Sequence, residues 1–166
     1  SDDGERLDDV EVVLRGGELP PTRVPWNEDT RDYRLSDFRW VPAMRLEVRR
    51  GDAWLDGQLD VPGATLIANP LPGATFRKAD APSLLVQWKD ERGVFAHTTV
   101  IHVQRAGVDR ELPAGALETA LSADELTSTS DERIRIERRN EVGLLGGARG
   151  SRLTAGTENA VTFNVE

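Results

Sequence analysis

Alternation of apolar and polar side chains with a period of two constrains the fold of this chain more than any other feature. It is clearest in three stretches: VEVVLRGG with Val10, Val12 and Leu14, AMRLEVRR with Met44, Leu46 and Val48, and AVTFNVE with Val161, Phe163 and Val165. This pattern is typical of a strand with one buried and one solvated face. The sequence therefore predicts an antiparallel strand at each of these places.

Further short runs, separated by glycine, proline and aspartate, also read as strands: DYRLSDF, AWLDGQLDV, ATLIAN, ATFRK, SLLVQWK, HTTVIHVQR, RIRIERR and SRLTAG. Regularly spaced short strands with such breaks favour a sandwich or a barrel. The segment ELPAGALETALSADELTST departs from the pattern, because Ser122 and Glu125 fit a capping box and Leu117, Ala120 and Leu121 have helical spacing. We expect an all-β fold, an antiparallel β-sandwich with one short helical connector.

The length of 166 residues suits one domain, or at most two small ones. Residues 1–7 are polar and predict a flexible linker that follows a removed signal or lipid-anchor segment. Residues 8–166 form the predicted sandwich domain, in which the first strands are an N-terminal extension. The proline-rich NPLPG at residues 69–73 offers an alternative division into 8–70 and 71–166.

Composition narrows the function classes. The net charge of -8 disfavours nucleic acid as a partner, because an acidic surface repels phosphates. The lack of cysteine excludes disulfides, zinc-thiolate sites and thiol nucleophiles, and no stretch reaches the ~18 apolar residues of a transmembrane segment. The catalytic fingerprints G-x-S-x-G, H-E-x-x-H, P-loop and dinucleotide-binding are also missing from the sequence. We therefore expect no enzymatic activity and no cofactor, with calcium as the one metal left open.

Several stretches together carry a family resemblance: DYRLSDF, RLEVRRGDAWLDGQLDVPGA, NPLPGATFRKADAPSLLVQWKD, LPAGALETALSADEL and RIRIERR. Over about residues 33–165 the chain resembles the β-sandwich regions of uncharacterised secreted or lipid-anchored bacterial envelope proteins. In those regions an immunoglobulin-like or fibronectin III-like half opens with a P-x-x-G-x-x-F/V turn and a strand ending in Trp. The resemblance implies a fold and a secreted or cell-envelope location, and it carries over no catalytic residue.

Trp88 ends such a strand. Leu84, Val86 and Trp88 share one strand face, and a large indole on an apolar face usually packs against the opposite sheet. We expect Trp88 to lie in the core.

One candidate binding patch is the loop VPWNEDTRDY, which contains Trp26, Glu28, Asp29 and Asp32. An aromatic ring beside carboxylates suits sugar stacking, and clustered oxygens suit calcium. The spacing matches no EF-hand loop. The alternative is a solvated loop anchored by one tryptophan.

A second candidate is a row of arginines, Arg133, Arg135 and Arg139, which shares a strand face with Glu137 opposite Ile134 and Ile136. Guanidinium groups bind carboxylates or sulfates in bidentate fashion, so the row is suited to an acidic glycan or an acidic protein partner. The alternative is pairing with carboxylates on a neighbouring strand.

Weaker candidates accompany these two. Arg50-Gly51-Asp52 spells an integrin-recognition tripeptide, although Gly-Asp also suits a hairpin turn. Trp54, Asp56, Gln58 and Asp60 share one face of a predicted strand, and the two aspartates lie too far apart for a glycosidase pair, which favours a solvated outer face. His97 and His102 are predicted to point to opposite sheet faces and so not to bind one metal.

These observations leave three functional hypotheses. The first is a non-catalytic module of the cell envelope or secreted space, structural or binding a protein or glycan. The alternative is a carbohydrate-active enzyme or carbohydrate-binding accessory domain, which requires a tryptophan exposed beside acidic side chains. The third is self-assembly through an edge strand such as AVTFNVE.

Overall fold

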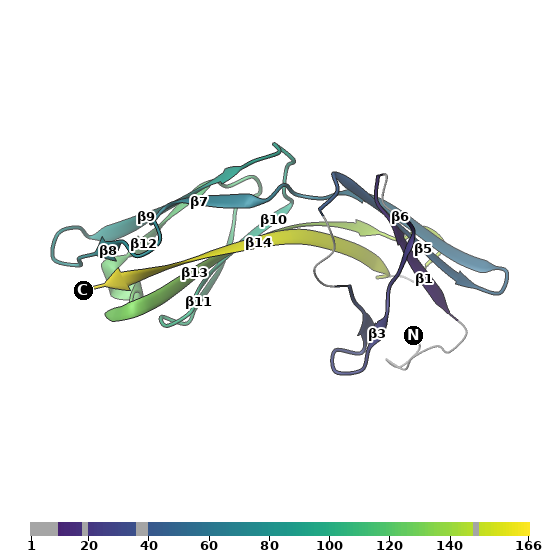
Figure 1. Ribbon diagram of the computed structural model, residues 1–166, viewed down its shortest axis with the longest axis horizontal. Helices are drawn as coiled ribbons and strands as arrows, with labels where there is room; N and C mark the ends of the chain where they lie inside the picture. The colour runs from purple at the N-terminus through teal and green to yellow at the C-terminus, as the bar shows by residue number, and fades with distance from the viewer. Residues whose placement is uncertain (1–9, 18–19, 36–39, 148–149) are drawn as a thin grey trace. The chain divides into compact units, whose positions relative to one another are not determined.

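The computed structural model describes residues 10–17, 20–35, 40–147 and 150–166. Figure 1 shows an all-β chain, as predicted, and within these residues the only helical element is the 3-10 turn Ala123–Glu125. In the same residues no helix has the length and apolar character needed to cross a bilayer. The predicted linker, residues 1–7, lies outside the described residues.

The strands are β1 (Glu11–Arg15), β2 (Thr22–Arg23), β3 (Trp26–Asn27), β4 (Asp32–Tyr33), β5 (Ala43–Arg50), β6 (Ala53–Asp60), β7 (Thr65–Asn69), β8 (Thr75–Phe76), β9 (Ser83–Asp90), β10 (Thr98–Val103), β11 (Val108–Leu112), β12 (Glu118–Ser122), β13 (Thr129–Gly143) and β14 (Arg152–Val165). The three clearest alternating stretches are confirmed as β1, β5 and part of β14.

The chain divides into two compact units. The first contains Ser1–Val61 and Glu141–Ala155, and the second contains Pro62–Asn140 and Gly156–Glu166. The chain thus enters the second unit after Val61, returns to the first after Asn140, and leaves it again after Ala155. Each unit is built from two stretches that are distant in the sequence.

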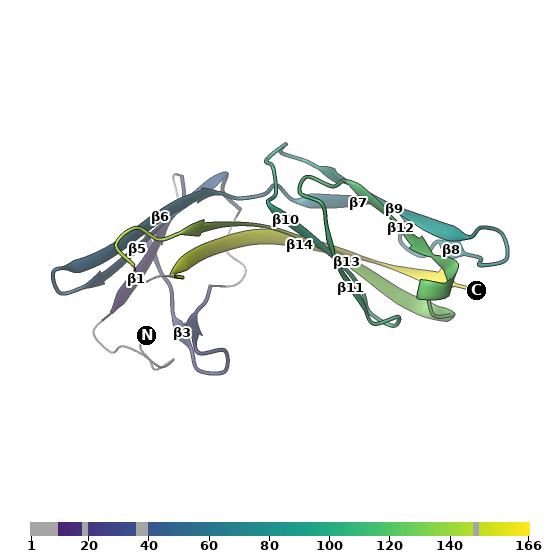
Figure 2. The same ribbon diagram turned by 180° about the vertical axis from the view of Figure 1, so that it is seen from behind.

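The first unit contains a sheet in the order β2-β1-β5-β6, and each neighbouring pair is antiparallel. β5 and β6 form a hairpin that Gly51 and Asp52 close, as Figure 2 lets the reader follow. Gly51 has a φ of 54°, which the first central position of a primed hairpin turn requires and which glycine adopts without strain. Because two residues close the hairpin, Arg50 pairs with Ala53 and every later pair follows.

The inward face of this sheet is apolar. Val12, Leu14 and Val24 form a buried cluster, against which Met44, Leu46 and Val48 of β5 pack. A second cluster in the same unit joins Leu59 and Val61 to Leu153.

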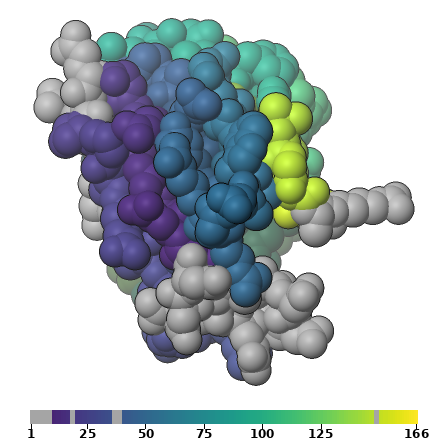
Figure 3. Space-filling view, turned by 90° about the vertical axis from the view of Figure 1, so that its right-hand side faces the viewer, coloured from purple at the N-terminus to yellow at the C-terminus, as the bar shows by residue number. Residues whose placement is uncertain are grey.

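The segment 141–155 lies beside β6. Asp56 and Leu145 form an antiparallel bridge, and Figure 3 shows the yellow-green end of this segment next to the blue β6 strand. A Cβ on Gly57 would lie 2.4 Å from Cδ2 of Leu144. Only a residue without a side chain lets Leu144 occupy that place against β6.

The second unit contains a five-stranded sheet, β11-β10-β13-β14-β8, and a three-stranded sheet, β12-β9-β7. Side chains from both sheets form one core, which includes Val86 and Trp88 of β9, Ile101 of β10, Ile136 of β13 and Phe163 of β14. Trp88 is only 3% exposed, so its predicted place in the core is confirmed.

A buried ion pair also lies in the second unit. Nη2 of Arg138 is 2.9 Å from Oδ2 of Asp90, and the Arg138 side chain is only 2% exposed. Arg138 also donates to the carbonyl oxygens of Gly63 and Val94, so its charge has partners in the interior. Removing such a group would leave Asp90 with an uncompensated charge.

The predicted helical connector and the predicted edge strand both differ from the structure. Residues 118–122 form strand β12, which pairs with β9 and buries Leu121 in the core. The helix expected from the spacing in this stretch is therefore absent there, and the helical turn is confined to residues 123–125. There the capping box is confirmed, because Glu125 accepts hydrogen bonds from the backbone N–H and the hydroxyl of Ser122. AVTFNVE is not an edge strand, because β14 lies between β13 and β8.

The predicted strand DYRLSDF is present only as β4, and its residues 36–38 fall outside the described part of the chain. SRLTAG and AVTFNVE belong to one long strand, β14.

Candidate binding site on the outward face of β1, β5 and β6

The outward face of the first unit's sheet gathers charged side chains around one tryptophan. Pairing between neighbouring strands aligns three rows of residues across β1, β5 and β6: Glu11, Arg49 and Trp54; Val13, Glu47 and Asp56; and Arg15, Arg45 and Gln58. Residues directly opposite each other on neighbouring strands have Cβ atoms ~5 Å apart, so each row is a line of side chains in contact range.

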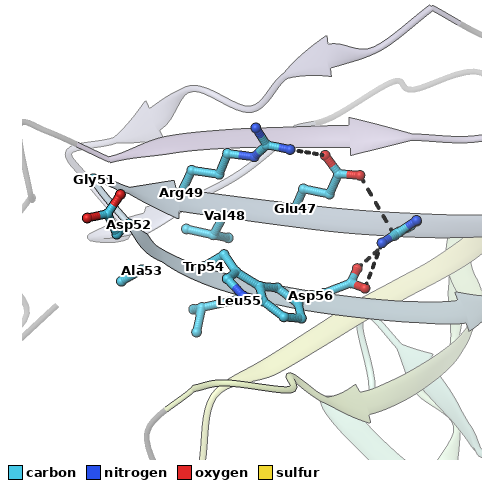
Figure 4. A pocket seen from close by; sticks show the side chains of 10 residues that line it. Glu47, Val48, Arg49, Gly51, Asp52, Ala53, Trp54, Leu55 and Asp56 are labelled. Carbon is cyan, nitrogen blue, oxygen red and sulfur yellow. Dashed lines mark hydrogen bonds and ion pairs between the residues drawn. The ribbon is translucent and has the colours of Figure 1, made fainter.

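Trp54 is 58% exposed and lines a pocket of about 400 Å³. The pocket lies on the β5–β6 hairpin, and Figure 4 shows Trp54 and Asp56 on β6 with Glu47 and Arg49 on β5. On β6 the buried positions are Gly57 and Leu59, so Trp54 stands on the solvent side of the strand. The hairpin thus holds a large aromatic ring in water and in a fixed register.

Ion pairs fix the polar side chains of this face. Glu47 lies within 4 Å of three arginines, at 3.3 Å from Arg15, 3.8 Å from Arg45 and 3.7 Å from Arg49. Arg45 also donates two hydrogen bonds to the carboxylate of Asp56, at 2.8 and 2.9 Å. This bidentate geometry is the one that best orients both groups.

The same contacts set the ionisation of the pair. The hydrogen bond from Arg45 holds the pKa of Asp56 below its ordinary value, and its partner's pKa is raised by the same hydrogen bond. Both groups are therefore charged at neutral pH. A ligand at this site meets a carboxylate acceptor and guanidinium donors in fixed positions.

A second hollow, of about 230 Å³, adjoins the first. Glu11, Val13, Arg15 and Pro21 line it, and it shares Glu47 and Arg49 with the Trp54 pocket. Through these two shared residues the two hollows together reach from β6 across β5 to β1.

The predicted loop around Trp26 forms a small hairpin of β3 and β4. Trp26 packs edge-on against Tyr33, with ring centroids 5.2 Å apart, and it is half-buried. Glu28 and Asp29 are exposed in the turn, while Asp32 accepts hydrogen bonds from Thr30 and Arg34. Trp26 therefore anchors the hairpin through Tyr33, and Asp32 is engaged by its neighbours in the same hairpin.

The predicted arginine row lies on β13, with Arg133, Arg135, Glu137 and Arg139 outward and Ile134 and Ile136 buried. Arg135 pairs with Glu158 of β14 at 3.0 Å, and Arg139 with Glu137 at 3.5 Å. The pair of Arg135 with Glu158 is the cross-strand pairing that the alternative interpretation expected, whereas Arg139 contacts a carboxylate of its own strand.

The weaker candidates are placed as follows. Arg50-Gly51-Asp52 lies in the exposed β5–β6 turn. Nδ1 of His102 is 2.5 Å from Asp109 and its Nε2 is 3.4 Å from Glu137. The ring of His97 instead lies tilted beside Phe95, with ring centroids 6.3 Å apart, so the two histidines have different neighbours. Among the described residues, no group of three or more histidines and carboxylates is arranged to hold a metal ion.

A comparison with models of known protein families found no match, and a search of curated protein sequences found none either. The role of each residue therefore follows from its contacts in this chain.

Sequence reasoning placed Trp54 on the same strand face as Asp56 but did not treat it as a binding residue. The sequence of the turn does indicate which residues lie opposite Trp54 and Asp56. A two-residue turn at Gly51-Asp52 fixes the hairpin register, which places Arg49 opposite Trp54 and Glu47 opposite Asp56. The contribution of β1 to this face follows only from tertiary pairing.

Proposed function

We propose that the protein is a non-catalytic glycan-binding module of the cell envelope or the secreted space, with its site in the Trp54 pocket. The second unit is its immunoglobulin- or fibronectin III-like sandwich. The resemblance over residues 33–165 supports this class and location. Two sheets that share one core in the second unit also agree with it.

The observation that carries the proposal is the exposed indole of Trp54 beside ion-paired polar groups. A pyranose ring has an apolar C–H face and hydroxyl groups around its edge. Trp54 offers a flat apolar surface for that face, while Glu47, Asp56 and the arginines offer acceptors and donors for the edge. Binding sites commonly combine an apolar wall with a few oriented polar groups in this way.

The chemistry of the carboxylates favours binding over hydrolysis. Glycosidases use one carboxyl group as a general acid, which requires a raised pKa. Here the hydrogen bond from Arg45 lowers the pKa of Asp56 instead. Glu47 is paired with three arginines.

Calorimetric titration with a panel of neutral and acidic oligosaccharides tests the proposal. The variant is Trp54→Ala and its matched control is Phe95→Ala, since Phe95 in the second unit is equally exposed, at 59%. We expect the wild type to bind at least one oligosaccharide. Trp54→Ala lowers that affinity by roughly 30-fold or more, as the loss of a central aromatic contact does, and Phe95→Ala leaves it unchanged.

Two outcomes contradict the proposal. One is the absence of binding to every oligosaccharide of the panel by folded wild-type protein. The other is a glycan affinity that Trp54→Ala leaves unaltered, because the site would then lie elsewhere on the molecule. Thermal melting of each variant confirms that the fold is retained.

A further inference from the structure

The charges on the outward face of β1, β5 and β6 balance, although the chain as a whole is acidic: the face carries Arg15, Arg45 and Arg49 against Glu11, Glu47 and Asp56. Three arginines surround Glu47, and Arg45 also binds the carboxylate of Asp56. A guanidinium carries five N–H donors, and one carboxylate has about four acceptor positions. Donors on this face therefore exceed the carboxylate oxygens that contact them, in a chain whose net charge is -8.

Arg49 has the least engaged guanidinium of the three. Its side chain is 68% exposed, and its contact with Glu47 is 3.7 Å, beyond the usual range of a hydrogen bond. Arg45 instead makes two short hydrogen bonds to Asp56. The planar fork of Arg49 is thus available for a bidentate interaction with an anion.

Arg49 is also the direct cross-strand neighbour of Trp54. Both residues line the same pocket, so an anionic group and an apolar ring face can be bound at once, ~5 Å apart. A carboxylated sugar presents that pair of features, because the carboxylate is attached to the ring that stacks.

We infer that the ligand of the Trp54 pocket is an acidic glycan built from uronic acids, with a sugar ring on Trp54 and its carboxylate bound by Arg49. This inference rests on the proposed function and narrows its ligand class. Arg49 favours this ligand over a neutral glycan, because a carboxylate can accept two short, charge-assisted hydrogen bonds from the guanidinium, whereas the contact with Glu47 is 3.7 Å long.

The shape of the surface extends the inference to more than one sugar. The second hollow shares Arg49 and Glu47 with the first and adds Arg15, on β1. From β6 to β1 the surface crosses two strand spacings, roughly 10 Å. The glycan therefore runs across the strands, with Trp54 at one end and Arg15 toward the other.

The test compares uronate oligosaccharides with their methyl esters, which keep the sugar and lose the charge. Oligogalacturonate, hyaluronan and alginate fragments, each with its ester, are titrated into the wild type, Arg49→Ala, Arg49→Lys and Trp54→Ala. Arg135→Ala is the matched control, because Arg135 is an arginine paired with a carboxylate on another sheet. Thermal melting verifies the fold of each variant.

We expect one acid form to bind the wild type at least about tenfold more tightly than its ester, the range of one charge-assisted hydrogen-bond pair. Arg49→Ala removes this difference, Arg49→Lys restores only part of it, and Arg135→Ala keeps it. The affinity of the acid form falls with rising salt.

The results that would contradict the uronate inference differ from those that would contradict glycan binding. Equal, Trp54-dependent binding of acid and ester overturns the uronate inference and leaves glycan binding intact. Acid preference that survives Arg49→Ala also overturns the inference, because another residue then binds the charge. Absence of Trp54-dependent binding to any acid, ester or neutral sugar overturns the proposed function itself.

Discussion

Two sheet faces of this chain present arginine at alternate positions, and they differ in what surrounds the arginines. On β13, Arg135 pairs with Glu158, and Arg139 with Glu137. On the face of β1, β5 and β6, Arg15 of β1 and two arginines of β5 converge on Glu47, and an exposed tryptophan stands on β6. A row of arginines in the sequence is therefore ambiguous, and the cross-strand neighbours decide between a structural network and a binding surface.

The tryptophans show the same contrast. Trp88 is buried in the core of the second unit, and Trp54 is exposed in a pocket of the first. Burial of Trp88 stabilises the fold, whereas the ring of Trp54 stays in contact with solvent and is therefore accessible to a ligand. Large effects on stability should therefore come from the second unit's interior, and large effects on binding from the first unit's outer face.

The largest effect on stability is expected from Trp88→Ala. Removing a fully buried aromatic side chain leaves a cavity and costs about 3–5 kcal/mol of the free energy of unfolding. Trp54→Ala changes that free energy by less than about 0.5 kcal/mol, since the ring packs little of its surface. Urea unfolding followed by circular dichroism measures both. Similar losses for the two variants would break the comparison.

For arginine as well, substitution of a buried residue should reduce stability more than substitution of an exposed one. Arg138→Ala leaves Asp90, whose side chain is only 10% exposed, without its ion-pair partner, and we expect a loss of about 3 kcal/mol. Arg49→Ala, on the exposed face, should change stability by less than about 0.5 kcal/mol. The same urea titration applies. A small effect of Arg138→Ala would mean that water reaches Asp90.

The pH dependence of stability separates Asp90 from Asp56. Burial alone would raise the pKa of Asp90, but the hydrogen bonds from Arg138 and from the N–H groups of Arg92 and Gly93 outweigh it, so the pKa is lowered. A group with a lowered folded pKa stabilises above its unfolded value, ~3.9, and loses that contribution as the pH falls toward the folded pKa.

We therefore expect the wild type to lose stability below about pH 4, and Asp90→Asn to flatten this part of the curve. Asp56→Asn should flatten it less, because the pair of Asp56 with Arg45 is exposed to solvent screening. Thermal midpoints between pH 2 and pH 7 measure both effects. A larger change for Asp56→Asn would reverse the assigned roles of the two aspartates.

The smallest effect concerns the pairing on β13. A double-mutant cycle of Arg135→Ala and Glu158→Ala should give a coupling energy of about 0.2–1 kcal/mol, the usual range for exposed ion pairs. Chemical denaturation of the four proteins yields this value. A coupling of zero would leave Arg135 available to a ligand and weaken the contrast with β5.

Much of the fold could be predicted from the sequence, because alternation reports directly which face of a strand is buried. It identified β1, β5 and the buried side chains of β14, and it placed Trp88 in the core. Alternation did not separate helix from strand at residues 118–122. The spacing of Leu117, Ala120 and Leu121 fits a helix, but pairing with β9 makes residues 118–122 a strand. Local spacing could not reveal that partner.

The candidate site could be predicted only in part. The hairpin turn determines that Trp54 faces Arg49, and this follows from Gly51 and Asp52 alone. The pairing of β1 with β5, which brings Arg15 to Glu47, joins residues more than thirty positions apart. Such register depends on the packing of both strands on a common core and is not encoded near either residue.

The most direct test of the central claim is a ¹⁹F NMR titration of protein labelled with 5-fluorotryptophan. The four tryptophans give four signals, which single Trp→Phe variants assign. On addition of the uronate oligosaccharide that binds in calorimetry, we expect the Trp54 signal to shift and the Trp88 signal to stay unchanged. A titration in which Trp54 does not respond, or in which another tryptophan responds in its place, would contradict the account.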